Sequence, residues 1–243
     1  MFKTITEHHD FIVVDKAPGV NFHDEGDIGS GLFSQVKRQL ENQSEKQQGN
    51  NITEVELYPV HRLDKMTSGL VIFAKTLAAA QYFGKLFENH NIDKYYLAIS
   101  DKKPSKKQGL IKGDMTKSRR GMFKLLRSMD NPAITQFFSY SIANKQRLYL
   151  LKPNSGKTHQ LRVALSSIGA PIVGDPLYYP QSNDKSAKAD RGYLHAYALK
   201  FSYLGEAFEF ISPPSSGESY LSKQTTEQLT AIKKPWQLNW PRL

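Results

Sequence analysis

The stretch HRLDKMTSG, from His61 to Gly69, places an imidazole, a guanidinium and a carboxylate within four residues, directly before the apolar run LVIFA. In an extended segment, side chains two residues apart project from the same face. The Arg62 guanidinium could therefore hold the Asp64 carboxylate ionised, as a nucleophile must be. A second interpretation is that DKMTSG is a hairpin turn in which Asp64 binds its own backbone. The residues alone leave both interpretations open.

A second group of polar residues lies within SGKTHQLRVALSSIG, residues 155–169. Apolar residues recur at helical spacing and predict one buried side: Leu161, Leu165 and Ile168. The pattern predicts a helix that is capped by Thr158 and ends at Gly169. His159 and Arg162, three residues apart, are expected to share a second, polar face of this helix.

The elements that must hold these groups are mostly strands. Apolar runs bounded by turn signals predict strands over residues 11–14, 55–60, 69–74, 92–100, 133–142 and 146–153, and a closing hairpin over 192–212. Helical spacing predicts helices from Leu32, after the N-cap Thr76, and within residues 212–232. This order is typical of an α+β fold with a mixed, mostly antiparallel sheet flanked by helices.

The chain of 243 residues is expected to form a single domain, residues 1–243. The polar stretch NQSEKQQGNNIT, residues 42–53, has no periodicity and predicts a mobile surface loop within it. The tail KKPWQLNWPRL carries two tryptophans, which we expect to pack against the protein.

The charge of the chain favours a polyanionic partner. Lys and Arg number 33 against 23 Asp and Glu, which gives a formal charge of +10 and a pI near 9.5. Basic residues are concentrated in segments 102–107 and 117–127. Nucleic acid would suit such a surface, although a solvated basic face explains the same charge.

The composition excludes several other classes of protein. With no cysteine, disulfides, thiolate nucleophiles, iron–sulfur clusters and cysteine-bound zinc are ruled out. No apolar run is long enough to span a membrane, and the N-terminal segment MFKTITEHHDFIVV lacks the pattern of a secretion signal. We therefore expect a cytoplasmic protein without a membrane partner.

Four motifs resemble those of the RluA-type RNA pseudouridine synthases, in the same order along the chain. HRLDKMTSG is similar to the family signature, DKAPG to its Lys-Pro-x-Gly element, and KYYLA to its Lys-x-Tyr-x-Ala element. SGKTHQLRVALSSIGAPIVGD is similar to the family's Gly-Arg-Thr-His-Gln-Ile/Leu-Arg element and the Gly-Asp turn that follows, with Lys157 in place of arginine and Ala164 where histidine is common. The resemblance implies the pseudouridine synthase fold with a central catalytic cleft, without the N-terminal RNA-binding module of some relatives.

The resemblance also implies an isomerase that converts uridine in tRNA or rRNA to pseudouridine, with Asp64 as the catalytic carboxylate. Tyr96 would pack against the base and take part in proton removal, Arg162 would pair with Asp64, and Arg62 would fill the space of a flipped nucleotide or hold the backbone. The other residues expected to bind RNA are His61, Thr67, Lys94, Lys157, His159, Lys117, Arg119 and Arg120. We expect a monomer that needs neither a cofactor nor a metal.

The chemical role of Asp64 stays open, and the sequence offers three alternative functions. Asp64 could attack the sugar, attack the uracil ring, or remove a sugar proton. A non-catalytic RNA-binding protein of the same fold is the principal alternative, although it would be expected to lack the carboxylate. A glycosyl hydrolase would require a second carboxylate, and Asp175, in a Gly-Asp turn, is interpreted as structural. A metal-dependent nuclease would require clustered ligands, which the scattered histidines do not provide.

Overall fold

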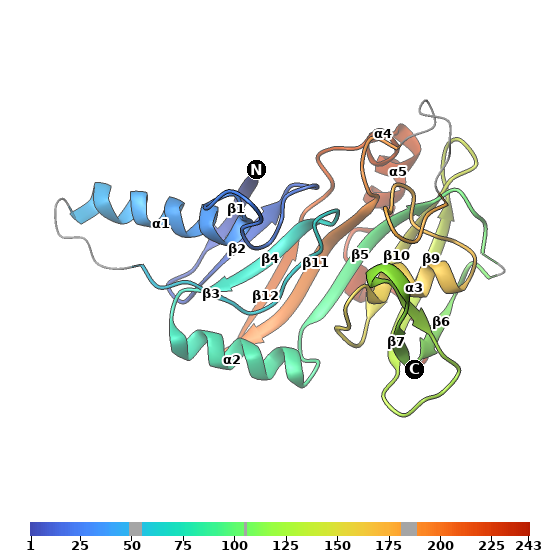
Figure 1. The fold of residues 1–243 in the computed structure, drawn as a ribbon, viewed down its shortest axis with the longest axis horizontal. Coiled ribbons are helices and arrows are strands. Elements are labelled where there is room, and N and C mark those ends of the chain that lie inside the picture. Colours follow the sequence, from blue (N-terminus) through green and yellow to red (C-terminus); the bar gives the residue numbers. More distant parts are fainter. Residues whose placement is uncertain (49–54, 105, 181–188) are drawn as a thin grey trace. The chain divides into compact units, whose positions relative to one another are not determined.

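The computed structural model describes residues 1–48, 55–104, 106–180 and 189–243 (Figure 1). Its contacts divide the chain into two compact units, Met1–Asn91 and Ile92–Leu243. Each unit combines antiparallel strands with flanking helices, which confirms the predicted fold class. Across the ranges described, no helix combines the length and the apolar character needed to cross a bilayer.

The first unit is built on two buried strands, β2 (Phe11–Lys16) and β4 (Ser68–Ala74), which pair antiparallel. β1 (Phe2–Glu7) pairs with β2, and β3 (Tyr58–Pro59) pairs with β4. The strand expected over residues 55–60 is therefore limited to two residues. All of β4 is buried, which explains its unbroken apolar sequence.

Two helices cover opposite faces of this sheet. In α1 (Leu32–Gln48), the ring of Phe33 lies 6.0 Å from that of Phe73. In α2 (Leu77–Glu88), the ring of Phe83 lies 5.4 Å from that of Phe11. Phe11 pairs with Ala74, the neighbour of Phe73 in β4. Because neighbouring residues of a strand face opposite ways, the two helices cover different faces.

The helix boundaries partly match those predicted. Thr76 caps α2 as expected, and its Oγ1 accepts the N–H of Ala79 at 3.1 Å. In contrast, α1 continues through residues 42–48, so the surface loop predicted over 42–53 is wrong there, and residues 49–53 lie outside the described ranges. Gln, Glu and Lys favour helix, and they extend a helix that apolar residues have already started.

The sheet of the second unit has the order β12-β11-β5-β10-β9-β6, with antiparallel neighbours throughout. Its strands are β5 (Asp93–Ser100), β6 (Gln108–Gly113), β9 (Ala133–Ser141), β10 (Arg147–Pro153), β11 (Leu194–Tyr203) and β12 (Glu206–Ile211). The helices of this unit are α3 (Gln160–Ser167), α4 (Glu218–Leu221) and α5 (Lys223–Ile232). The strands predicted over 92–100, 133–142 and 146–153 and the closing hairpin are confirmed.

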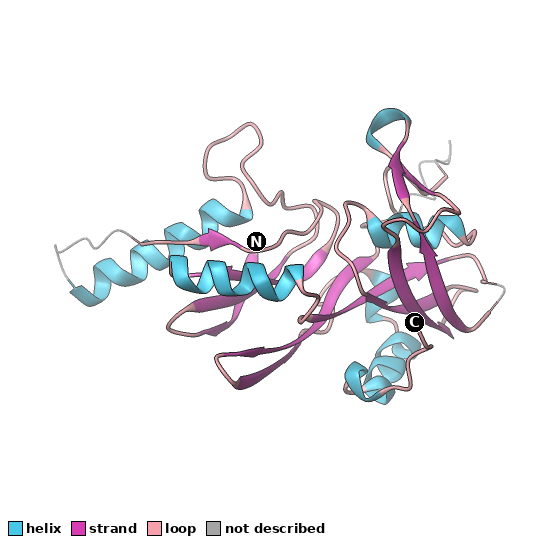
Figure 2. Cartoon of the chain, turned by 90° about the horizontal axis from the view of Figure 1, so that it is seen from below, coloured by secondary structure: helices cyan, strands magenta, loops and turns pink. Residues whose placement is uncertain are grey.

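A small hairpin stands apart from this sheet. β7 (Met115–Lys117) and β8 (Phe123–Leu125) pair with each other, and the 3₁₀ turn η1 (Arg119–Gly121) joins them. Figure 2 shows the hairpin projecting from the unit with this helical turn at its tip. We call β7, η1, β8 and the residues up to Arg127 the basic hairpin.

The C-terminal tail covers one face of the second sheet. The Trp240 ring lies 4.8 Å from Phe138 and 5.7 Å from Tyr95, and its Nε1–H donates to the carbonyl oxygen of Pro235 at 2.8 Å. Trp236 lies 6.1 Å from Tyr95. The tryptophans therefore pack against the protein, as predicted, and the neighbouring residues of β5 face the other side of the sheet.

Candidate active site

Asp64 lies on the turn that leads into β4, in the first unit. Its carbonyl oxygen accepts the N–H of Thr67 at 3.0 Å, which closes the turn. Leu63, Met66 and Thr67 are buried, with exposed fractions of 5%, 9% and 2%, whereas Asp64 itself is half-buried. The buried neighbours fix the backbone on both sides of the carboxylate.

A buried lysine holds the same turn against a neighbouring loop. Lys16, at the end of β2, is 0% exposed. Its Nζ donates to the carbonyl oxygens of Ala17 at 3.0 Å, Val20 at 2.7 Å and Lys65 at 3.2 Å. Lys65 follows Asp64 directly, so the ammonium group of Lys16 fixes the backbone beside the carboxylate. This role of Lys16 is not among those expected from the sequence, although a lysine that ends a buried strand before Ala-Pro-Gly is a signal for one.

The two residues before this turn differ from expectation in their contacts. His61 Nε2 accepts the N–H of Ile72 at 2.9 Å, and its ring lies 4.7 Å from that of Phe87, so His61 ties the segment to β4 and α2. Arg62 is exposed and, among the residues with described positions, has no ion-pair partner. Of the two interpretations that the sequence leaves open, the Arg62–Asp64 ion pair is therefore not formed, because residues 61–64 precede β4 and the alternation of strand faces does not apply to them.

In the second unit, Tyr96 lies in the middle of β5. It is half-buried, opposite Leu151 of β10 and Ala196 of β11. The register shifts between Ala196 and Ala198, which is a β-bulge beside Tyr96, and bulges are common where a strand orients a functional side chain. Lys94 precedes Tyr96 on the same face, is 7% exposed, and has a pKa lowered by burial.

Arg162 forms a buried ion pair within the second unit. Its Nε donates to Asp175 Oδ2 at 2.7 Å and its Nη2 to Asp175 Oδ1 at 2.8 Å, and the two side chains are 4% and 0% exposed. Asp175 Oδ1 also accepts the N–H groups of Leu177 and Tyr178 at 2.8 and 3.0 Å. Asp175 thus has the structural role predicted for it, and in addition it orients the guanidinium of Arg162.

Helix α3, which carries Arg162, begins at Gln160 rather than after a Thr158 cap. His159 precedes the helix in the left-handed conformation, with φ 58°, and its side chain does not cap the helix. His159 therefore does not lie on the helical face of Arg162 as predicted. Neither Thr158 nor the apolar spacing signals this positive φ, which asparagine, aspartate and histidine adopt more readily than other non-glycine residues.

The side chain of Gln160 anchors the start of α3 to β9. Its Nε2 donates to the carbonyl oxygen of Ile134 at 3.0 Å and to Thr135 Oγ1 at 3.1 Å. Its Oε1 accepts the N–H of Lys157 at 3.0 Å and the hydroxyl of Ser155 at 2.8 Å. A buried amide with all of these partners fixes the position of the helix. Gln160 is a further positioning residue, and its role is not among those expected from the sequence.

The cations of the basic hairpin are exposed. They are Lys117, Arg119, Arg120, Lys124 and Arg127. Within the described part of the chain, none of the five forms an ion pair. At the base of the hairpin, hydrogen bonds from Ser128 and from the N–H groups of Asp130 and Asn131 lower the pKa of Asp114. Lys157 Nζ donates to the carbonyl oxygen of Asn131 and so lies at the same base.

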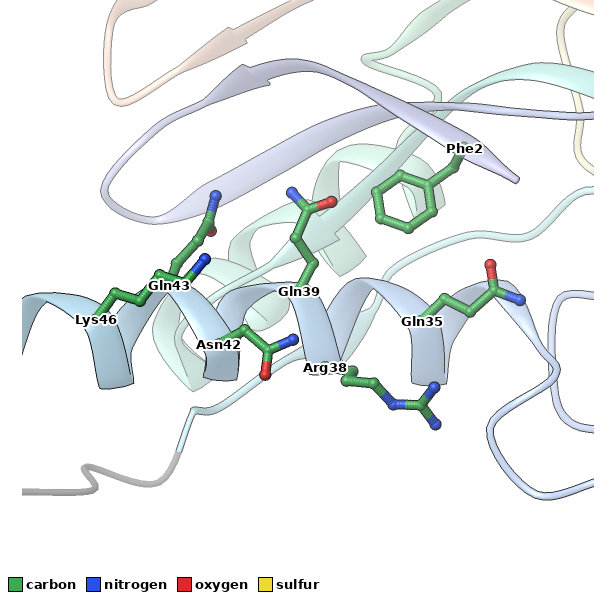
Figure 3. Close-up of a pocket in the computed structure, with 7 residues that line it drawn as sticks. All are labelled: Phe2, Gln35, Arg38, Gln39, Asn42, Gln43 and Lys46. Atoms are coloured by element: carbon green, nitrogen blue, oxygen red, sulfur yellow. The ribbon is translucent and has the colours of Figure 1, made fainter. Parts of the chain in front are cut away.

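The other basic segment and the cavity of the first unit add little to this site. In segment 102–107, residue 105 lies outside the described ranges, and Lys102 Nζ lies 3.8 Å from Asp101. A cavity of about 370 Å³ lies between β1 and α1 (Figure 3) and is lined by Phe2, Gln35, Arg38, Gln39, Asn42, Gln43 and Lys46. None of these is a predicted site residue. Among described residues, no three potential metal ligands cluster.

The predicted residues are thus divided between the two units. The first unit contains Asp64 with His61, Arg62 and Thr67, and the second contains Tyr96, Lys94 and Arg162 with the remaining cations. The second unit brings Arg162 close to Asp175 and places His159 near the basic hairpin. The Arg162–Asp64 pairing implied by the resemblance would join the two units and stays a prediction.

The family model for RNA pseudouridylate synthase matches residues 10–167. An uncharacterized RNA pseudouridine synthase of Haemophilus influenzae is 44% identical over 235 residues, which cover 96% of this chain and 97% of that protein. The dual-specificity RNA pseudouridine synthase RluA of Escherichia coli is 34% identical over 160 residues, 63% of this chain and 72% of RluA.

Other relatives are longer, and solved structures share the fold. Ribosomal large subunit pseudouridine synthase D of Borreliella burgdorferi is 33% identical over 167 residues, which span 67% of this chain but only 51% of that protein. The structure of human RNA pseudouridylate synthase domain containing 1 has a TM-score of 0.69 and 24% identity, with 97% of each chain covered. The motifs, the matched family model and the full-length relative agree, and the chain belongs to the RNA pseudouridylate synthase family of isomerases.

Proposed function

We propose that this enzyme isomerises a specific uridine of tRNA or rRNA and that Asp64 is its catalytic carboxylate. The observation that carries the proposal is the set of hydrogen bonds and buried neighbours that holds the Asp64 turn. The N–H of Thr67 closes the turn, the ammonium group of Lys16 donates to the carbonyl oxygen of Lys65 within it, and the apolar Leu63 and Met66 flank it. A catalytic group must be held in a narrow range of positions, and this carboxylate has a backbone with little freedom to move.

The reaction accounts for the need for one carboxylate. The bond between ribose C1′ and uracil N1 breaks, the uracil turns, and C1′ bonds to C5. C5 then loses its proton to solvent and N1 gains one, so nothing is oxidised or reduced. Asp64 would act as a nucleophile at the sugar or at the uracil ring, or as a base on the sugar. Each route begins from the ionised carboxylate, and none requires a cofactor.

We further propose that the target uridine is flipped out of its stack before it reacts. Extrusion costs roughly a few kcal/mol, which contacts between the protein and the RNA backbone must offset. The exposed cations of the basic hairpin are suited to this role because they are not committed to carboxylates among the described residues. Phosphate contacts of this kind give affinity without sequence preference.

The roles of Tyr96, Arg162 and Arg62 belong to the same proposal. Tyr96 would pack against the uracil, and Arg162, oriented by Asp175, would pair with Asp64. The exposed guanidinium of Arg62 is suited to a phosphate or to the space that the flipped nucleotide leaves. We also propose that the two units act together as one catalytic domain, in a cytoplasmic monomer.

The proposal is tested by mapping pseudouridines in total RNA from cells with and without the gene. Cells without it should lose pseudouridine at one or a few positions of tRNA or rRNA. Wild-type protein should restore them, as should the control Asp27→Asn, which alters an exposed carboxylate of the same unit. Asp64→Asn should not restore them. Restoration by Asp64→Asn, or no lost position, would contradict the proposal.

A further inference from the structure

Tyr178 connects the basic hairpin to the buried ion pair. Its hydroxyl oxygen accepts the N–H of Phe123 at 2.8 Å and lies 3.1 Å from Nδ1 of His159. Its ring lies against the guanidinium of Arg162, with 5.1 Å between the guanidinium carbon and the ring centroid. Its backbone N–H donates to Asp175 Oδ1 at 3.0 Å. One residue that is 9% exposed therefore contacts both features.

The hairpin needs contacts with the rest of the unit to hold its orientation. Each of its strands has only three residues, and an isolated two-stranded hairpin is marginally stable in water. Phe123 is the first residue of β8 and pairs with Lys117, next to the turn that carries Arg119 and Arg120. The bond from the Phe123 N–H therefore fixes the hairpin close to its cationic tip.

His159 completes this cluster. Its ring lies 5.6 Å from Phe123 and 5.8 Å from Tyr178, edge to face in both cases. His159 directly precedes α3 with a positive φ, a backbone conformation that neighbouring contacts must stabilise. The Tyr178 hydroxyl thus lies between the tip of the hairpin and the start of the helix that carries Arg162.

We propose that Tyr178 is a positioning residue that links the orientation of the basic hairpin to that of the Arg162 guanidinium. RNA phosphates that bind the hairpin would thereby stabilise the arrangement of Arg162 that the reaction uses. The phenol ring alone would suffice for packing against Arg162. The hydroxyl adds the link to the hairpin, which a phenylalanine would lack. This inference rests on the proposed function for its catalytic consequence, but not for the physical link itself.

The link is tested first without RNA, by amide hydrogen exchange of the whole protein. Tyr178→Phe removes only the hydroxyl, and the Phe123 amide should then exchange about 5–10-fold faster. Tyr179→Phe is the matched control, because its hydroxyl donates to Asp101 at 2.7 Å and not to the hairpin. Unchanged exchange at Phe123 in Tyr178→Phe, or equal acceleration in the control, would overturn the proposed link.

The catalytic consequence is tested by a double-mutant cycle on RNA modification. Arg120→Ala should lower kcat/KM, and Tyr178→Phe should lower kcat more than it changes KM. In the Tyr178→Phe background, Arg120→Ala should cost at least about 3-fold less than in the wild type. If the fold losses in kcat/KM of the two single variants multiplied to give the loss of the double variant, the hairpin and Arg162 would act independently. If the enzyme modified no RNA, the proposed function would fail while the exchange result still decided the link.

Discussion

Asp175→Asn tests the buried ion pair, because it changes one atom of a fully buried carboxylate. Asp175 accepts two hydrogen bonds from Arg162 and two from backbone N–H groups. Asparagine keeps one acceptor oxygen, but its amide NH₂ would face the Nε–H of Arg162, donor against donor. Arg162 would also lose the negative charge of Asp175 at a site only 4% exposed. Removing one partner of such a pair costs about 3–5 kcal/mol.

The assay is urea unfolding at neutral pH, with thermal unfolding as a second measure. We expect a loss of about 3–5 kcal/mol in the free energy of unfolding, which corresponds to a fall of roughly 10 °C in Tm. Arg162→Met combined with Asp175→Asn should regain part of this loss, because no uncompensated guanidinium stays buried. The control Glu209→Gln changes a surface carboxylate that pairs with Lys200 and Lys234, and should cost far less. Equal losses in Asp175→Asn and the control would refute the reasoning.

Three further predictions concern the buried Lys16 that binds the Asp64 turn, the pH dependence of stability and the binding of RNA. Lys16→Met removes three hydrogen bonds to carbonyl oxygens and should lower the free energy of unfolding by about 2 kcal/mol. It should also reduce kcat more than it changes KM, whereas the exposed control Lys65→Met should leave stability unchanged in urea unfolding. His195 is fully buried, with Nε2 2.7 Å from the carbonyl oxygen of Ser212, and burial lowers its pKa from 6.5 to about 4. The unfolded chain then binds a proton that the folded chain does not between pH 6.5 and pH 4. Stability should fall by about 3 kcal/mol as the pH drops through this range. Unfolding at several pH values should show a smaller fall in His195→Gln, and an identical fall would contradict the assignment. For RNA, the logarithm of the association constant should fall linearly with the logarithm of the salt concentration. Replacing Lys117, Arg119 and Arg120 together by alanine should make this negative slope less steep by about 2. An unchanged slope in filter binding would exclude the hairpin from phosphate contact.

Much of the secondary structure follows from local signals in the sequence. β2 and β4 are buried on both sides, so their apolar runs are unbroken and easily identified. Thr76 caps α2 through its own side chain, three residues from its partner. Beyond residue 42, α1 has no such signal, because this part of the helix is polar. It depends on the helix propensity of its residues and on propagation from the helical turns before it.

Motifs in the sequence give the residues of the proposed site but not their contacts. The proposed carboxylate, tyrosine and arginine each lie in a motif within a short segment. The partner of Arg162 is 13 residues away, and the carbonyl oxygen of Lys65 that Lys16 binds is 49 residues away. Such contacts depend on how strands and turns pack. For the same reason, the start of α3 depends on His159 and on contacts with Tyr178 that no sequence rule gives.

The most direct test of the account is tritium release from RNA labelled at C5 of uridine. Forming the C1′–C5 bond expels the hydrogen at C5, so every turnover of the purified enzyme releases one labelled proton to water. The wild type and Asp27→Asn should release tritium at the same rate. Asp64→Asn should be slower by at least about 10³-fold, while the protein stays folded and keeps most of its RNA affinity. Release by Asp64→Asn at the wild-type rate would contradict the catalytic role of Asp64.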